Sequence, residues 1–132
     1  MERSEAISHA VNQAYKALGV RPCNSRNKLH IQIRAAIGVA LSSYCNTYEI
    51  GAALNRDRSS VSHYTNKHVQ NLKYWKGYRE IHEMVSEEIG QNLQDHLLQL
   101  KIDNLNERID ELMARREQLM NQLKTQAQHE AA

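Results

Sequence analysis

The stretch Asn46–Tyr64, NTYEIGAALNRDRSSVSHY, decides the fold because it contains two helix starts separated by one tight turn. Asn46 stands three residues before Glu49, a spacing that predicts a capping box at the start of a short helix. Turn-forming residues at 55–56 end that helix. Asp57 then predicts the N-cap of a second helix, which follows at once.

The second helix, from Arg58 to about Tyr74, carries few apolar residues. Its inward stripe is expected to consist of Val61, Tyr64, His68 or Val69, and Leu72. The side chains that point outward are Arg58, Ser59, Ser62, His63 and Asn66, most of them near the start of the helix. Two helices joined by a tight turn, the second largely polar, are typical of a helix-turn-helix unit. Such an N-terminus suits base edges and phosphates, although a solvated surface helix also has a polar face.

Two further helices are predicted upstream of this stretch. Ser4 is a candidate N-cap for the first, and Gly19 fits the position just after its last turn. Residues 20–27 predict a loop. The next helix is expected from about residue 29 to 44, with Arg34 projecting near its start.

Charge is divided unevenly along the chain, although the formal net charge is only +2. Up to residue 79 there are twelve Lys and Arg against four Asp and Glu, and from Glu80 onward five against eleven. A basic front part indicates nucleic acid or another anionic surface as its partner.

Residues 6 to 72 resemble the C-terminal DNA-binding domain of the bacterial replication initiator DnaA. The signature of that family is Ile-Gly, a few residues, Arg-Asp-His-Thr/Ser-Thr-Val, one further residue, and His. The matching residues here are Ile50-Gly51 and then Arg56-Asp57-Arg58-Ser59-Ser60-Val61-Ser62-His63. A first helix ending at Gly19-Val20 and a basic loop at 26–28 also fit the family.

The resemblance implies a DNA-binding role for a defined set of side chains. Base contacts are expected from Arg34 in the minor groove and from Asp57, Arg58, Ser59 and Ser62 in the major groove. Phosphate contacts are expected from Arg26, Lys28, Asn46, Thr47, Arg56, Ser60, His63 and Lys67. These positions define a candidate interface with double-stranded DNA.

The departures from the family pattern carry expectations of their own. Arg58 replaces the usual histidine, and arginine prefers the O6/N7 edge of guanine, so the target sequence is expected to differ from the family's. Ser59 and Ser60 lack the methyl groups of the threonines that are common there. Asn55 stands in place of a turn glycine. No G-x-x-x-x-G-K-[ST] run exists, so the chain lacks the initiator's ATPase module.

The rear part of the chain predicts one long helix, because from Arg79 to about Gln128 it contains no proline and only one glycine. Its first apolar residues recur every four positions, which is interpreted as packing on the head or an irregular seam: Ile81, Val85, Ile89, Leu93 and Leu97. A coiled-coil pattern then extends over about 98–123. Its d positions are Leu98, Leu105, Leu112 and Leu119, and its a positions are Ile102, Ile109, Arg116 and Leu123.

Leucine at d with isoleucine at a favours a parallel two-stranded coil, and Arg116 at an a position discourages larger bundles. The flanking g positions are Lys101, Arg108 and Arg115, and they face Asn106, Met113 and Met120 at e. This pattern provides no ion-pair code. An antiparallel pair, a four-stranded assembly and a single helix folded back on the head therefore stay open.

Neither a metal site nor an enzyme active site is expected. His63 and His68 are five residues apart, so they do not share a helix face, and no Cys or His pair has zinc-finger spacing. The serines at 59, 60 and 62 lack a nucleophile elbow. The two cysteines lack metal-ligand spacing and follow no signal peptide, which indicates reduced thiols in a cytoplasmic protein. No apolar run approaches a membrane span.

These observations predict an all-α protein with a helix-turn-helix DNA-binding domain at 1–76, a long helix at 77–128 and a disordered tail at 129–132. We expect it to bind specific double-stranded DNA as a non-enzymatic coiled-coil homodimer without a cofactor. A transcriptional regulator or an origin-binding replication accessory protein, of phage or mobile-element type, would fit. The alternative is an adaptor whose coil binds a replication or packaging protein and whose head binds DNA only weakly.

Overall fold

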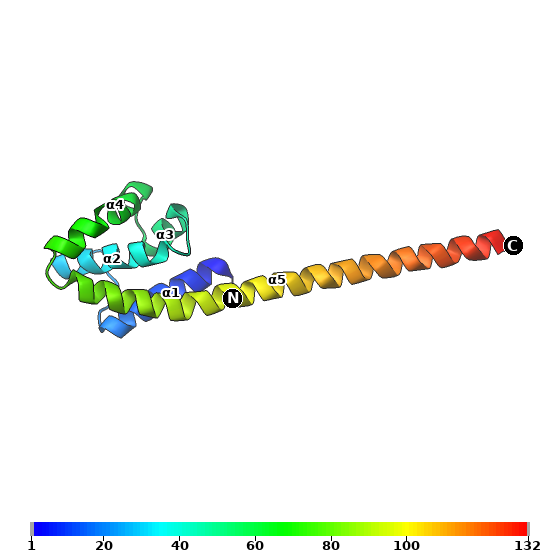
Figure 1. The fold of residues 1–132 in the computed structure, drawn as a ribbon, viewed down its shortest axis with the longest axis horizontal. Coiled ribbons are helices and arrows are strands. Elements are labelled where there is room, and N and C mark those ends of the chain that lie inside the picture. Colours follow the sequence, from blue (N-terminus) through cyan, green and yellow to red (C-terminus); the bar gives the residue numbers. More distant parts are fainter. Residues whose placement is uncertain (1, 132) are drawn as a thin grey trace. The chain divides into compact units, whose positions relative to one another are not determined.

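The structure, a computed structural model, describes residues 2–131, and every regular element in this range is a helix. The helices are α1 (Arg3–Leu18), α2 (Lys28–Leu41), α3 (Thr47–Leu54), α4 (Arg58–Tyr74) and α5 (Tyr78–Ala131), as Figure 1 shows. The expected all-α class is confirmed over the described residues. The chain divides into two compact units, Met1–Leu97 and Leu98–Ala132, so the division falls inside α5 rather than at residue 76.

The first unit, called the head below, has one hydrophobic core to which all five helices contribute. Its largest buried side chains are Ile33, Ile37, Leu41, Ile50, Val61, Tyr78, Val85, Ile89 and Leu93. The last four of these belong to α5, and Ile81 and Leu97 of the same helix pack against the core. The four-residue stripe at the start of the long helix therefore packs on the head, which explains why the head extends to Leu97.

α1 begins one residue before the predicted cap. Glu2 occupies the N-cap position without a side-chain hydrogen bond, and Ser4 already lies inside the helix. The Arg3 guanidinium instead donates to the Tyr44 carbonyl at 2.9 Å and pairs with the Glu49 carboxylate. This bond lowers the pKa of Glu49. Arg3 thus ties the start of α1 to α3, and the predicted Ser4 cap is wrong.

A cluster of aromatic rings fixes the turn between α4 and α5. The Tyr78 hydroxyl lies 2.8 Å from His68 Nδ1, and the His68 and His82 ring centroids are 4.4 Å apart. Trp75 packs edge-on against the Tyr78 ring. Burial raises the pKa of Tyr78 to about 12 and lowers the pKa of both histidines. Burial in this turn therefore favours the neutral imidazoles and the protonated phenol.

All described residues of the second unit, 98–131, are helical. α5 continues to Ala131, whereas a disordered tail was expected from residue 129, and Ala132 lies outside the described residues. The last turns, KTQAQHEA, contain no glycine or proline, and most of their residues have favourable helix propensity. None of the helices described over residues 2–131 is long and apolar enough to cross a membrane.

Candidate nucleic-acid interface

The turn between α3 and α4 depends on Gly51. The Arg56 amide donates to the Gly51 carbonyl at 2.9 Å, and a Cβ atom built on Gly51 would lie only 2.6 Å from the Arg56 carbonyl oxygen. Asn55 adopts the left-handed conformation, with φ of 55°, which asparagine tolerates better than most residues. The structure explains the Ile50-Gly51 pair. Ile50 is buried in the core, and the absence of a Cβ on Gly51 allows the Arg56 backbone to approach it closely.

α4 is fixed at its start by a cap and along its length by a narrow buried stripe. The Asp57 carboxylate accepts from the Ser60 amide at 2.8 Å, and this bond lowers the pKa of the carboxyl group. Val61 is fully buried, and a Cβ on Gly38 of α2 would lie 2.8 Å from the Tyr64 ring. α2 and α4 therefore pack closely, and the predicted Asp57 cap is confirmed.

The choice left open within the stripe is resolved in favour of His68. His68 is half-buried at the α4–α5 turn, whereas Val69 is 75% exposed. Asn71 is buried too, at 7% exposure, and the pattern of apolar residues gave no signal for it. The rest of the helix circumference, including Ser59, Ser62 and His63, faces solvent.

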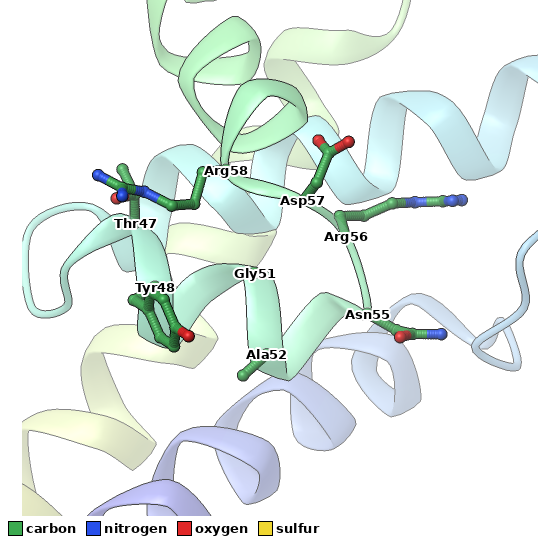
Figure 2. A pocket seen from close by; sticks show the side chains of 8 residues that line it. All are labelled: Thr47, Tyr48, Gly51, Ala52, Asn55, Arg56, Asp57 and Arg58. Carbon is green, nitrogen blue, oxygen red and sulfur yellow. The ribbon is translucent and has the colours of Figure 1, made fainter.

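A first hollow of about 510 Å³ lies where α3, the turn and the start of α4 meet. Its lining residues are Thr47, Tyr48, Gly51, Ala52, Asn55, Arg56, Asp57 and Arg58. Figure 2 shows Arg58, at the start of α4, and Arg56, in the preceding turn, pointing in opposite directions. Tyr48 is 74% exposed here, and sequence reasoning missed it because it lies outside the apolar face of α3.

A second hollow of about 520 Å³ lies between the 20–27 loop, α2 and α4. Its lining residues are Arg26, Ile31, Arg34, Arg56, Ser59, Ser60, His63 and Tyr64. Four predicted phosphate contacts are thereby brought together from segments at least thirty residues apart in sequence: Arg26, Arg56, Ser60 and His63. Arg56 lines both hollows and joins them.

Arg34 was expected to project near the start of α2, but it is buried. Its side chain is only 4% exposed, and its guanidinium donates to the carbonyls of Cys23 at 3.0 Å and Ser25 at 2.7 Å. The same side chain also lines the second hollow. In this structure Arg34 fixes the loop that carries Arg26, and the base contact expected of it stays a prediction.

The remaining predicted contacts lie outside or at the edge of the hollows. Lys28 is the exposed first residue of α2, and Lys67 and Ser62 are exposed along α4; none of the three lines either hollow. Asn46 caps α3, since its side chain accepts from the Glu49 amide at 2.9 Å while its own amide donates to the Glu49 carboxylate. The predicted capping box is confirmed, and Asn46 is partly occupied by it.

The second unit presents an apolar stripe, called the coil face below. It comprises the eight predicted a and d positions: Leu98, Ile102, Leu105, Ile109, Leu112, Arg116, Leu119 and Leu123. Its seven apolar members are between 50% and 67% exposed. Complete burial of a leucine or isoleucine contributes about 1.5–3 kcal/mol, so a large part of that stabilisation is unrealised in the single chain. Met113 and Met120 extend the same face.

Comparison with known proteins adds no relative. No protein-family model, curated protein or solved structure matches the chain. Among residues 2–131, no group of three or more His, Cys, Asp or Glu side chains is arranged to hold a metal ion. The residues brought together at the start of α4 thus stand as the candidate site.

Proposed function

We propose that the head is a helix-turn-helix domain of the DnaA C-terminal type and that the protein binds specific double-stranded DNA as a dimer. One observation carries the proposal: the first turns of α4 are capped, exposed and polar, and a basic hollow adjoins them. A helix N-terminus with free side-chain donors is suited to a major groove, where each base pair presents a distinct pattern.

Base reading falls to the exposed residues at the start of α4. Arg58 has a free guanidinium that is suited to guanine O6 and N7, and Ser59 and Ser62 supply hydroxyl groups one turn apart. Asp57 accepts the Ser60 amide with one carboxylate oxygen, and its exposed carboxylate can still accept from cytosine N4. Arg58 is therefore expected to dominate the choice of base.

Phosphate binding falls to the second hollow. Arg26 and His63 are exposed, Arg56 is partly exposed, and the α4 N-terminus adds its helix dipole. Contacts of this kind orient the domain and carry no sequence information themselves. Binding through them should weaken as the salt concentration rises.

Burial of Arg34 supports the dimeric form of the proposal. With Arg34 held by loop carbonyls, one head exposes fewer of the expected base-contact residues than the resemblance implies. Two heads joined by their second units would recover affinity, because the second head binds as part of the same molecule. A transcriptional regulator or an origin-binding accessory protein of a cytoplasmic replication system would have this design.

The second candidate function is an adaptor, and the exposed coil face favours it. In that case the coil face would bind a replication or packaging protein, and the head would bind DNA weakly. The two candidates differ in specificity. A reader should prefer its site over random duplex by a factor of at least about a thousand, whereas an adaptor should show only weak binding that salt abolishes.

The decisive experiment is a selection from random duplex DNA with the full-length protein at near-physiological salt, followed by titration of the enriched site. We expect an enriched sequence whose binding by Arg58→Ala is relaxed at one base pair. Arg79→Ala is the matched control, because it removes the same charge from an exposed residue that lines neither hollow. Absence of enrichment, or equal loss in both variants, would favour the adaptor.

A further inference from the structure

The residue types on the coil face follow the heptad positions, which is not the case for every apolar stripe. All four d positions are leucine, and the first two a positions are isoleucine. A parallel, in-register pair keeps a against a and d against d, so isoleucine meets isoleucine and leucine meets leucine. An antiparallel pair mixes the two positions within each layer. Isoleucine at a with leucine at d is the combination that favours two parallel strands.

We propose that the coil face pairs with the coil face of a second copy of this chain, in parallel and in register, and that Arg116 limits the assembly to two chains. The inference deepens the dimeric part of the proposed function and rests on it. It is tested without DNA, so that pairing and DNA recognition can fail separately.

Charge along the g positions supports the parallel orientation. Lys101, Arg108 and Arg115 occupy successive g positions, and none of the flanking e positions is basic or acidic. In an antiparallel pair g faces g, which sets one basic row against the other and is unfavourable. In a parallel pair g faces e, so Arg108 lies beside Met113 of the second copy and Arg115 beside Met120. The aliphatic stems of the arginines can then cover the methionine side chains.

Arg116 should limit the coiled coil to two chains. The methionines at e widen the apolar face, and alone they would favour more strands. Arg116 lines an exposed hollow of about 500 Å³ with Leu112, Leu119, Met120 and others, so its guanidinium is open to solvent in the single chain. Two strands leave a route to solvent for a long side chain at a, whereas a third or fourth strand encloses the charge.

The same residue makes pairing sensitive to salt. The helix neighbours of Arg116 at three and four residues are Leu112, Met113, Leu119 and Met120, so no carboxylate on its own helix neutralises it. A parallel pair brings the Arg116 side chains of both chains into one layer, whereas Arg115 has Glu111 four residues before it on its own helix. Screening of this repulsion should tighten the dimer as salt rises, which is opposite to the effect of salt on DNA binding.

Disulfide trapping tests the orientation in the full-length protein. Cys23 is exposed and is replaced by serine; Cys45, whose pKa burial raises to about 11, is replaced by alanine. Leu98→Cys and Leu123→Cys are then prepared separately and mixed under thiol–disulfide exchange. The two positions lie about 38 Å apart along one helix, so only correctly facing thiols can bond.

Each variant alone should form a homodisulfide if the pair is parallel. Disulfides that form only in the mixture would show an antiparallel pair and overturn the orientation. No disulfide in any sample, together with a monomer mass in sedimentation equilibrium, would overturn self-pairing and leave the coil face to another partner. Far-UV circular dichroism shows whether each variant keeps its helix.

Sedimentation equilibrium tests the role of Arg116. The unsubstituted protein should be a dimer whose dissociation constant falls at least about threefold between about 0.05 M and 0.5 M NaCl. Arg116→Leu should tighten assembly at least about tenfold, flatten the salt dependence and add species larger than a dimer. Gln118→Leu, at a c position, is the control for added hydrophobicity. If it has the same effect, or if Arg116→Leu stays a salt-sensitive dimer, Arg116 does not set the stoichiometry.

Discussion

The two parts of α5 contain the same kinds of residue and have opposite surroundings. Between Tyr78 and Leu97 the side chains of Val85, Ile89 and Leu93 are completely buried in the head. Between Leu98 and Leu123 the apolar side chains of the coil face are at least half exposed. The spacing differs as well, since the first part repeats every four residues and the second alternates three and four. The first part of α5 thus contributes to the core of the head, whereas the apolar face of the second part is unpaired in the single chain.

The largest expected effect comes from making the same substitution in both parts of α5. Ile89→Ala removes a fully buried side chain and should lower the free energy of unfolding of the head by about 3–4 kcal/mol. Ile109→Ala should leave the unfolding of a dilute, dissociated head unchanged and weaken only chain association. Urea denaturation at two protein concentrations separates the effects. Equal, concentration-independent losses would contradict the division of α5.

Substitution of two glycines gives the next effect, with opposite signs. Gly51→Ala sets a Cβ against the Arg56 carbonyl and should cost about 2–3 kcal/mol, because the turn backbone has to move. Gly90→Ala, inside α5, meets only the Tyr44 hydroxyl at 3.4 Å and should stabilise the helix by up to about 1 kcal/mol. Thermal unfolding of both variants measures the difference. A harmless Gly51→Ala would mean that the turn does not need this glycine.

Two arginines of the head should separate stability from recognition. Arg34→Ala leaves the Cys23 and Ser25 carbonyls without their donor and should lower stability by about 2 kcal/mol. Arg58→Ala should leave the melting temperature nearly unchanged and cost about 1–3 kcal/mol of binding to the selected site. Calorimetry and fluorescence anisotropy give the two readouts. If Arg34→Ala keeps full stability and loses specificity, the loop role assigned to it is wrong.

The smallest expected effect is a pH dependence confined to the head. Burial lowers the pKa of His68 and His82 below the ordinary value of about 6.5, so the folded head favours their neutral forms. Glu83 is the charged neighbour that opposes this shift at His82. The unfolded chain binds more protons below pH 6.5, so stability is complete above that pH and decreases as the pH falls toward the lowered values. Urea midpoints at several pH values measure it, and His68→Gln should reduce the slope.

Much of the fold could be predicted because local signals and tertiary packing agree. Asp57 and the Asn46–Glu49 box lie at helix starts, where short-range hydrogen bonds alone fix the structure. Ser4 misled because a tertiary bond of Arg3 places the start of α1 earlier. The sequence did not predict that the head extends to Leu97. Apolar spacing shows which face of a helix is buried, but only the folded chain shows which elements that face packs against.

The sequence predicted which residues make up the candidate site, but not which of their side chains are accessible to solvent. The residues at the start of α4 follow from helix periodicity and are exposed as expected. Arg34 carries the same charge as Arg58, and the sequence does not show that loop carbonyls surround it. Tyr48 was missed for a related reason, since an exposed tyrosine beside a cap gives no periodic signal.

Burial of Arg34 also has a consequence for how this protein could diverge. The loop, the Gly51 turn and the Asp57 cap are fixed by contacts within the head, whereas Arg58, Ser59 and Ser62 contact mainly solvent. Under the proposed function, substitutions at these three positions would change the preferred DNA sequence at little cost in folding stability. Related chains with different targets should vary there and retain Arg34, so that a new specificity is reachable by single, individually tolerated changes.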